Sequence, residues 1–299
     1  LVMVGIMGAT NNLWHPAAIS FLSGAYPKNR GYVLSIHTLG ASLGDSLAPL
    51  CIGAMLVVLT WQETAVWGSI PVLVIAAMIL MSLVRMDRGT DGSITRKITV
   101  GEYFKGLGLM FTDRAAMGLC LMAGFRSMTQ QGLLMFIPIY LLDVLKVGPF
   151  MMGVGVMAMQ LGGFISGPLA GAWSDRIGRR PIVIAAATGT TVVVIFLALV
   201  PNEYLFIAGV SVLGFVLFAL RPVIHSWMMD LNPPEMHGTA TSALFGAQSG
   251  LSLPIPIIGG WIADSYGVGA VFYLLAATMV VANVLVFMLP ESEKIEHSD

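Results

Sequence analysis

Charged residues are scarce in this sequence of 299 residues. Lysine, arginine, aspartate and glutamate together make up 10% of the chain, whereas a soluble domain carries roughly 25%. Hydrophobic residues reach 57%, so too little polar surface remains to cover a water-soluble fold. The formal net charge of −1 creates no field that attracts nucleic acid or acidic partners. The composition therefore excludes most soluble enzymes, nucleic-acid-binding proteins and disordered chains.

Cysteine is almost absent as well, and no motif for a cofactor or a metal occurs. Cys51 and Cys120 both lie in apolar runs, which is neither a disulfide framework nor a zinc-binding pattern. The sequence contains no phosphate-binding loop and no local signature of a catalytic triad. We expect no cofactor, no metal site and no enzymatic activity.

Long apolar runs are what the sequence does contain. A helix that spans a bilayer needs about 20 mostly apolar residues. The segments that meet this requirement are 1–25, 31–59, 64–85, 114–143, 149–172, 182–201, 204–230, 238–263 and 267–290. The predicted fold class is an all-α membrane protein with nine transmembrane helices. Because Leu1 opens inside an apolar run without a basic leader or a cleavage site, we expect a chain truncated at its N-terminus rather than a signal peptide.

One long polar segment, residues 86–113, divides the predicted helices into two groups. We expect residues 1–85 to form three helices of one bundle and residues 114–290 to form a second bundle of six helices. Residues 291–299 would then form a polar tail. Within the linker, residues 99–111 fit either an amphipathic helix on the membrane surface or an irregular segment.

Lysine and arginine lie almost wholly on one side of the predicted membrane. If residues 26–30 are cytoplasmic and the spans alternate, the opposite side keeps only Lys146. The basic residues of the cytoplasmic loops and tail are Lys28, Arg30, Arg85, Arg88, Arg96, Lys97, Lys105, Arg114, Arg176, Arg179, Arg180 and Lys294. Because basic loops stay in the cytoplasm, this asymmetry predicts that residue 1 is outside and the C-terminal tail is cytoplasmic.

Two internal repeats support a transporter-like architecture. At a constant offset, Pro27, Gly31, Ser35, Pro49 and Gly53 recur as Pro234, Gly238, Ser242, Pro256 and Gly260. In addition, Gly171-x3-Asp175-x2-Gly178 recurs as Gly260-x3-Asp264-x2-Gly267, on the opposite side of the predicted membrane. A parallel repeat that contains inverted repeats is the internal symmetry of one large class of transporters.

Residues 171–181, Gly-Ala-Trp-Ser-Asp-Arg-Ile-Gly-Arg-Arg-Pro, resemble the loop signature of the major facilitator superfamily, G-x3-D-[RK]-x-G-[RK]-[RK]. In that family the signature joins helices two and three, and a copy joins helices eight and nine. The resemblance implies helices four to twelve of a twelve-helix carrier with two bundles. A weaker resemblance, to the fosmidomycin-resistance-like branch, rests on His15-Pro16, residues 31–49 and residues 136–140.

The same resemblance implies a cytoplasmic latch that holds one state of a rocking transport cycle. Physically, Gly171 would let two helices approach closely, and Asp175 would be favoured against a helix N-terminus. The alternative is a tight turn whose arginines only set the topology. The predicted latch residues are Gly171, Asp175, Arg176, Gly178, Arg179 and Arg180.

Charged residues near the middle of a span cost about 2.5–3.5 kcal/mol each on insertion scales and therefore require an explanation. Arg126 and Arg221 lie at such positions, and each is followed four residues later by a polar side chain, Gln130 and His225 respectively. One interpretation is a solute cavity whose arginines select a solute of anionic character. The alternative is that Asp45 neutralises the arginines.

A further polar pair lies in the first predicted span. Asn11 and His15 are four residues apart and share a helix face. They either line the same cavity or bond to each other, or His15 bonds to a backbone carbonyl freed by Pro16. The predicted cavity residues are therefore Arg126, Gln130, Arg221, His15 and Asn11.

The spacing Gly31-x8-Gly40-x3-Gly44 is similar to that of the superfamily's antiporter motif, in which a proline follows the last glycine. Asp45 stands at that position and introduces a titratable carboxylate at mid-membrane. Asp45 and His37 are candidates for binding a coupling proton. A structural carboxylate paired with an arginine is the alternative.

The predicted function is secondary transport of a small organic solute by alternating access between two helix bundles. Proton-linked efflux or metabolite transport is favoured, and a proton-linked importer of the same fold remains open. Alternatives from other classes are a membrane sensor or assembly protein and a polytopic membrane enzyme. The expected partners are a small anionic solute, a proton and the lipid bilayer, with no nucleic acid, for a monomer of a bacterial inner membrane.

Overall fold

A computed structural model describes residues 18, 22, 30–86, 108, 113–232 and 236–289. Within these residues every regular element is a helix, which confirms the predicted all-α fold class. The predicted first span, residues 1–25, lies outside the described residues except for Ala18 and Leu22. The possible surface helix at 99–111 also lies outside them, except for Gly108.

Two helices precede the polar linker, α2 (Arg30–Met55) and α3 (Trp61–Met86). At the start of α3 the Thr60 N–H donates to a Glu63 carboxylate oxygen at 2.8 Å, and the Glu63 N–H donates to the Thr60 hydroxyl at 3.3 Å. This reciprocal capping satisfies two backbone donors that a helix start leaves open. The apolar side chains of α3 are exposed along most of its length, as expected of a helix that faces lipid.

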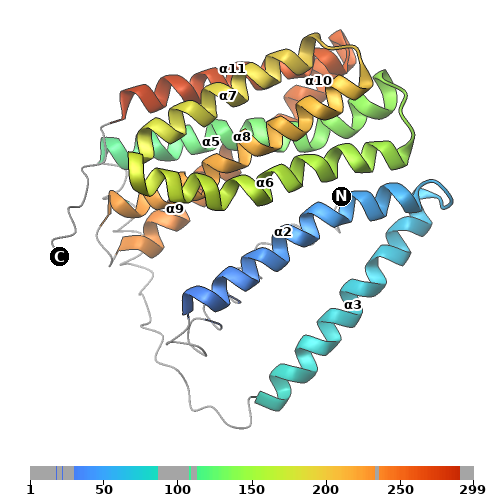
Figure 1. Ribbon diagram of the computed structural model, residues 1–299, viewed down its shortest axis with the longest axis horizontal. Helices are drawn as coiled ribbons and strands as arrows, with labels where there is room; N and C mark the ends of the chain where they lie inside the picture. The colour runs from blue at the N-terminus through green and yellow to red at the C-terminus, as the bar shows by residue number, and fades with distance from the viewer. Residues whose placement is uncertain are drawn as a thin grey trace. The chain divides into compact units, whose positions relative to one another are not determined.

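The helices that follow the linker form a bundle, here called the α5–α11 bundle (Figure 1). Its elements are α5 (Arg114–Ile139), η2 (Tyr140–Val144), α6 (Pro149–Ile177), α7 (Arg179–Leu199), α8 (Glu203–Asp230), α9 (His237–Ser252), α10 (Ile255–Tyr266) and α11 (Val268–Met288). Helix α6 packs against α8, α5 packs against α9 and α11, and α7 packs against α8 and α11. Each α-helix of the bundle therefore contacts at least two others.

Four of the described spans differ from the predicted bounds. The span predicted at 149–172 continues to Ile177. The span predicted at 31–59 ends at Met55, where a turn begins. The span at 114–143 changes from α-helix to one π-helical turn after Pro138, and such π turns are frequent at functional sites. The span at 238–263 is divided into α9 and α10 at Leu253 and Pro254, because proline interrupts the backbone ladder of a helix.

Five described helices are long and apolar enough to cross a membrane, and the predicted count of nine spans is therefore not established. They are the 61–82 part of α3, and α6, α7, α8 and α11. Three other described α-helices of the α5–α11 bundle are not among them. Polar residues interrupt the apolar run of α5, and α9 and α10 are each shorter than a full span.

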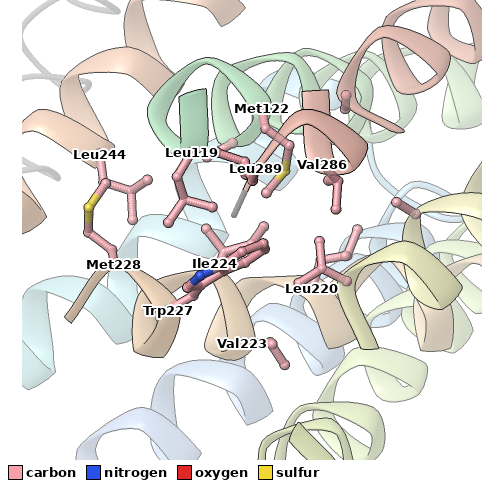
Figure 2. Packing of buried hydrophobic residues seen from close by; sticks show 14 of the residues in the cluster. Leu119, Met122, Leu220, Val223, Ile224, Trp227, Met228, Leu244, Val286 and Leu289 are labelled. Carbon is pink, nitrogen blue, oxygen red and sulfur yellow. The ribbon is translucent and has the colours of Figure 1, made fainter. Parts of the chain in front are cut away.

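The core of the α5–α11 bundle is divided into two apolar clusters. One contains Leu119, Met122, Leu220, Val223, Ile224, Trp227, Met228, Leu244, Val286 and Leu289 (Figure 2). The other includes Leu133, Phe136, Val156, Val210 and Phe272. On α5, α7 and α11 the buried polar residues lie between these clusters along the helix. This polar layer consists of Arg126, Ser127, Thr129, Thr190, Thr191 and Thr278.

Glycines allow α6 and α8 to touch backbone to backbone. A Cβ atom added at Gly214 would lie 1.9 Å from the Met159 carbonyl oxygen, and one added at Gly162 would lie 2.8 Å from the Ser211 carbonyl oxygen. No side chain fits in these positions without separating the helices. Small residues at a helix interface are the usual means of close packing in membranes.

Two turns have the same geometry, as the predicted inverted repeat requires. Gly178, between α6 and α7, has φ 99° and ψ 157°, and Gly267, between α10 and α11, has φ 87° and ψ 156°. Their N–H groups donate to the carbonyl oxygens of Ser174 and Ala263 at 3.0 and 2.9 Å. This backbone region is essentially restricted to glycine, which explains the glycine in both copies of the repeat.

Candidate solute-binding site

Arg126 places a guanidinium inside the α5–α11 bundle. The residue lies in the middle of α5 and is only 2% exposed. Its Nη2 atom donates a 3.1 Å hydrogen bond to the Leu217 carbonyl oxygen on α8, whereas its Nε atom is buried without a partner among the described residues. Because an arginine carries five donor hydrogens, this single carbonyl uses only a small part of its capacity.

Arg221 and His225 bring two more basic groups from α8. They are four residues apart and share a helix face. Arg221 is exposed and His225 is half-buried. Arg126 reaches this stretch of α8 through its hydrogen bond to the Leu217 carbonyl oxygen, one turn before Arg221. The Nε2 atom of His225 is buried without a partner in the described part of the chain, and its ring lies 5.2 Å from that of Phe245 on α9. We refer to Arg126, Arg221 and His225 as the cationic cluster.

No carboxylate in the described part of the α5–α11 bundle lies at the depth of the cationic cluster. The acidic residues there are all at or near the ends of helical elements: Asp113, Asp143, Asp175, Glu203, Asp230 and Asp264. Positive charge inside a bundle is strongly stabilised by an anion, because the interior screens charges poorly. Among the described residues, no three His, Cys, Asp or Glu side chains gather closely enough to bind a metal ion.

Hydroxyl groups connect the polar layer to the neighbouring helices. The Thr129 and Thr278 hydroxyls share a 2.9 Å hydrogen bond between α5 and α11. The Ser252 hydroxyl donates to Ser127 on α5 at 3.0 Å. Because Ser252 is the last residue of α9, the break between α9 and α10 lies beside the residue that follows Arg126. Broken helices of this kind border the substrate sites of many transporters.

The structure brings together two of the five predicted cavity residues, Arg126 and Arg221. Gln130 lies one turn along α5 from Arg126 and is half-buried. His15 and Asn11 lie outside the described residues. The cluster also includes His225, which the sequence placed on the same helix face as Arg221.

The predicted coupling residues lie on α2. Asp45 is exposed, in a compact unit separate from the α5–α11 bundle. His37 also belongs to α2, but its side chain lies outside the described part of the chain.

The signature residues form the end of α6 and the start of α7 rather than an extended loop. Helix α6 continues through the signature to Ile177, and Gly178 alone turns the chain into α7. An added Cβ at Gly171 would meet open space. The close helix approach predicted at this glycine is therefore wrong for the described structure. Arg176 is exposed.

Arg179 makes most of the contacts of the signature. Its Nε donates to Asp230 Oδ2 at 2.9 Å, and its Nη1 donates to the Ser174 hydroxyl at 2.7 Å and to Asp175 Oδ1. The Asp175 side chain is 63% exposed, whereas that of Asp230 is 30% exposed. The Asp175 carboxylate therefore pairs with Arg179, the first residue of α7. Through Arg179, α6, α7 and α8 are connected at one end of the bundle.

Sequence reasoning did not identify Asp230 and Ser174 as partners of the signature. An acidic residue at the last position of a cytoplasm-directed span, opposite three arginines, is the signal that points to Asp230. Arg180 has a separate role, because its Nη2 donates to the Phe287 carbonyl oxygen at 2.8 Å. A basic side chain at the last carbonyls of α11 satisfies acceptors that a helix end leaves open.

Curated proteins similar to this chain include transporters linked to drug resistance. The chain is 29% identical over 154 residues to the multi-drug resistance efflux pump PmrA of Streptococcus pneumoniae serotype 4, a match over 50% of this chain and 38% of the pump. It is 32% identical over 125 residues to the multidrug resistance protein MdtG of Serratia proteamaculans, a match over 42% of this chain and 30% of that protein. The chain thus covers well under half of either relative.

A solved structure and a family model also match. The proton:xylose symporter XylE bound to 6-bromo-6-deoxy-D-glucose is 19% identical, with a TM-score of 0.49 over 65% of this chain and 46% of the symporter. The model described as Major Facilitator Superfamily matches residues 1–159 and again residues 119–299. The apolar helices mark an integral membrane protein. Because the two stretches that match the family model together span every residue, the chain belongs to the Major Facilitator Superfamily.

Proposed function

We propose that this chain forms part of a secondary active carrier that moves a small organic solute with an anionic group by alternating access. The observation that carries the proposal is the cationic cluster. Arg126 is buried within the α5–α11 bundle and donates to the Leu217 carbonyl oxygen, one turn before Arg221 on α8, and the described carboxylates of the bundle lie at or near the ends of its elements. A solute carboxylate or other oxyanion supplies the missing negative charge.

The chemistry of the cluster suits an oxyanion attached to an organic group. A guanidinium presents a planar set of donors that matches a carboxylate, and charge-assisted hydrogen bonds are about twice as strong as neutral ones. Phe245, 43% exposed and in contact with the His225 ring, offers an aromatic face to the apolar part of a solute. Gln130 adds a half-buried amide on α5.

The proposed carrier has two bundles. Residues 1–85 belong to the first, residues 86–113 link the two, residues 114–290 form the second, and residues 291–299 form a cytoplasmic tail. The packing of α5, α6, α7, α8, α9 and α11 against one another supports the second bundle. The distribution of lysine and arginine supports an outer residue 1 and a cytoplasmic C-terminus.

The signature acts in this proposal as a cytoplasmic latch. The support is the set of contacts of Arg179, which link the end of α6 to the end of α8. Breaking such contacts in one state and remaking them in another would bias a two-state cycle. A static turn that only fixes topology is the alternative.

Two directions of transport are candidates, efflux and proton-linked import. The names of the similar proteins PmrA and MdtG favour efflux across a bacterial inner membrane. A proton-linked importer is the second candidate. Asp45 and His37 on α2 are candidates for binding a coupling proton.

The anionic solute is tested by ligand binding to the purified protein in detergent. Benzoate and benzamide share one ring and differ in charge, so only benzoate should raise the melting temperature. Arg126→Gln and Arg221→Gln should each weaken benzoate binding at least about tenfold, since a hydrogen bond to a charged group contributes about 1.5–3 kcal/mol.

The matched control is Arg114→Gln. Arg114 is an exposed arginine at the first residue of the same helix, α5, and its loss should leave benzoate affinity unchanged. Equal effects of benzoate and benzamide, or full benzoate affinity in both cluster variants, would contradict the proposal.

A further inference from the structure

His225 has a titratable side chain. Anion binding by Arg126 and Arg221 does not by itself explain why this side chain lies beside them. It lies one turn along α8 from Arg221, and its Nε2 atom is buried without a partner among the described residues. A buried polar atom that makes no hydrogen bond is costly, and native structures contain few of them. The position therefore calls for an acceptor or a donor that arrives from outside the bundle.

The charged groups that act on His225 are both basic. Arg221 acts on it from its own helix, and Arg126 acts on it from α5. Helix α9 presents the Phe245 ring and carries no carboxylate between His237 and Ser252. The remaining charged residues of the packed helices lie at helix ends: Asp113 and Arg114 at the start of α5, Asp175 and Arg176 on α6, Arg179 and Arg180 on α7, and Glu203 and Asp230 on α8.

At the cationic cluster, the binding of a proton and the binding of an anion favour each other. A proton on His225 adds a third positive charge to a site at whose depth the described parts of α5, α8 and α9 carry no carboxylate. An anion bound by Arg126 and Arg221 offsets that charge and gives the ring an acceptor. Each therefore raises the affinity for the other, and by linkage the two effects are equal, typically about 5- to 150-fold.

We propose that His225 binds a proton together with the anionic group of the solute, so that the cluster loads and releases the two as a pair. The inference rests on the proposed function, because it requires an anion at Arg126 and Arg221. The proton comes from the water on the side to which the site is open, and it returns to water when the anion leaves. The imidazolium formed in between donates from both ring nitrogens.

Paired loading has a consequence for direction. One proton and one singly charged anion carry no net charge together, so a pH gradient drives the solute in the direction in which protons flow. Of the two candidate directions, the pairing therefore favours the importer wherever the outside is the more acidic side.

Calorimetry with benzoate as the probe tests this inference directly. Titrations in two buffers of different ionisation enthalpy report the number of protons taken up per benzoate bound. As the pH is lowered from about 8 to about 5, where a carboxylate stays mostly ionised and His225 gains its proton, the protein should take up a proton with benzoate, and its affinity should rise several-fold. His225→Gln should bind benzoate with an affinity that does not change with pH and without proton uptake.

A matched histidine and a second variant complete the experiment. His237→Gln, at the first residue of α9, should keep the proton uptake of the unsubstituted protein, and His225→Asn should repeat the result of His225→Gln if the latter does not fold. Arginine-dependent benzoate binding with undiminished proton uptake in both His225 variants would overturn this inference alone. Benzoate binding that is indifferent to Arg126 and Arg221 would overturn the proposed function as well.

Discussion

Single side chains decide how the polar layer of the α5–α11 bundle is satisfied. Arg126 gives one hydrogen bond to Leu217, whereas Thr129 and Thr278 satisfy each other between α5 and α11. Interhelical hydrogen bonds of this kind contribute about 0.6 kcal/mol on average in membranes, so the threonines position α5 more than they stabilise it. The cationic cluster differs from these threonines. Its donors without a protein partner would gain much more binding free energy from an anionic ligand than the described protein groups provide.

The glycine contact between α6 and α8 predicts a large effect of a single methyl group. In Gly214→Ala the new Cβ would meet the Met159 carbonyl oxygen at 1.9 Å, and a backbone atom cannot move aside as a side chain does. Overpacking of this kind costs typically about 1–3 kcal/mol, and the contact with backbone places Gly214→Ala at the upper end. Thermal unfolding in detergent should show the loss.

Gly171→Ala is the matched control for this substitution. Its Cβ meets open space, and alanine exceeds glycine in helix propensity by about 1 kcal/mol. Gly171→Ala should therefore unfold at the same temperature as the unsubstituted protein or slightly above it. A Gly214→Ala protein as stable as Gly171→Ala would show that the two helices separate at no cost.

Regular helix is interrupted in the α5–α11 bundle at two glycine connections, one helix break and one π-helical turn. The α6–α7 and α10–α11 connections are single glycines with matching dihedral angles. The α9–α10 break lies beside the polar layer, and the π-helical turn follows Pro138 at the end of α5. Each is a place where the backbone ladder of a helix is interrupted, and such places can absorb a change of angle between helices.

The contacts of Arg179 predict unequal roles for the two aspartates at the end of the bundle. Asp175→Asn removes an exposed pair, and such pairs contribute about 0–1 kcal/mol. Asp230→Asn removes the better shielded 2.9 Å contact, which should contribute about 1–2 kcal/mol. We therefore expect Asp230→Asn to lower the melting temperature more than Asp175→Asn does.

A double-mutant cycle isolates the Asp230 contact. If the contact is direct, Asp230→Asn should have little further effect in an Arg179→Gln background. Additive effects of the two substitutions would show that Asp230 acts independently of Arg179. The same variants, examined by distance measurements across the bundles, report whether the signature biases the transport cycle as a latch.

For the molecule as a whole, membership in the Major Facilitator Superfamily supports the proposal that the cationic cluster belongs to a solute pathway. The cluster is built entirely from α5 and α8 of one bundle. Affinity for the anionic group can therefore reside in that bundle, while other parts of the carrier contribute to selectivity and to access.

Transport by the reconstituted protein distinguishes the candidate coupling residues. Under an imposed pH gradient, proteoliposomes should accumulate benzoate faster than protein-free liposomes, which benzoic acid enters unaided as a neutral acid, so the protein-dependent rate is the measure of accumulation. His225→Gln should lose this accumulation but retain exchange of benzoate down its own gradient, because the anion still binds without its proton.

Asp45→Asn provides the comparison in the same assay. If the proton binds His225, the Asp45→Asn protein should still accumulate benzoate. Loss of accumulation in Asp45→Asn, together with normal accumulation in His225→Gln, would instead assign the coupling proton to α2. Loss of both accumulation and exchange in either variant would indicate a structural role for that residue.

The sequence by itself determined the class of the protein, because scarcity of charge, apolar run length and basic asymmetry are properties of the chain that need no contacts to be known. It also located the signature and the arginines that cost energy in a membrane. Only the tertiary structure decided that Arg126, Arg221 and His225 share one region of the α5–α11 bundle with no carboxylate at their depth among its described residues. It also decided that Arg179 selects Asp230 and Ser174, and that Gly214 rather than Gly171 is the point of close approach within the described part of this bundle. These outcomes depend on which helix faces are turned toward each other, and helices of similar hydropathy can pack in many rotations that the chain alone does not distinguish.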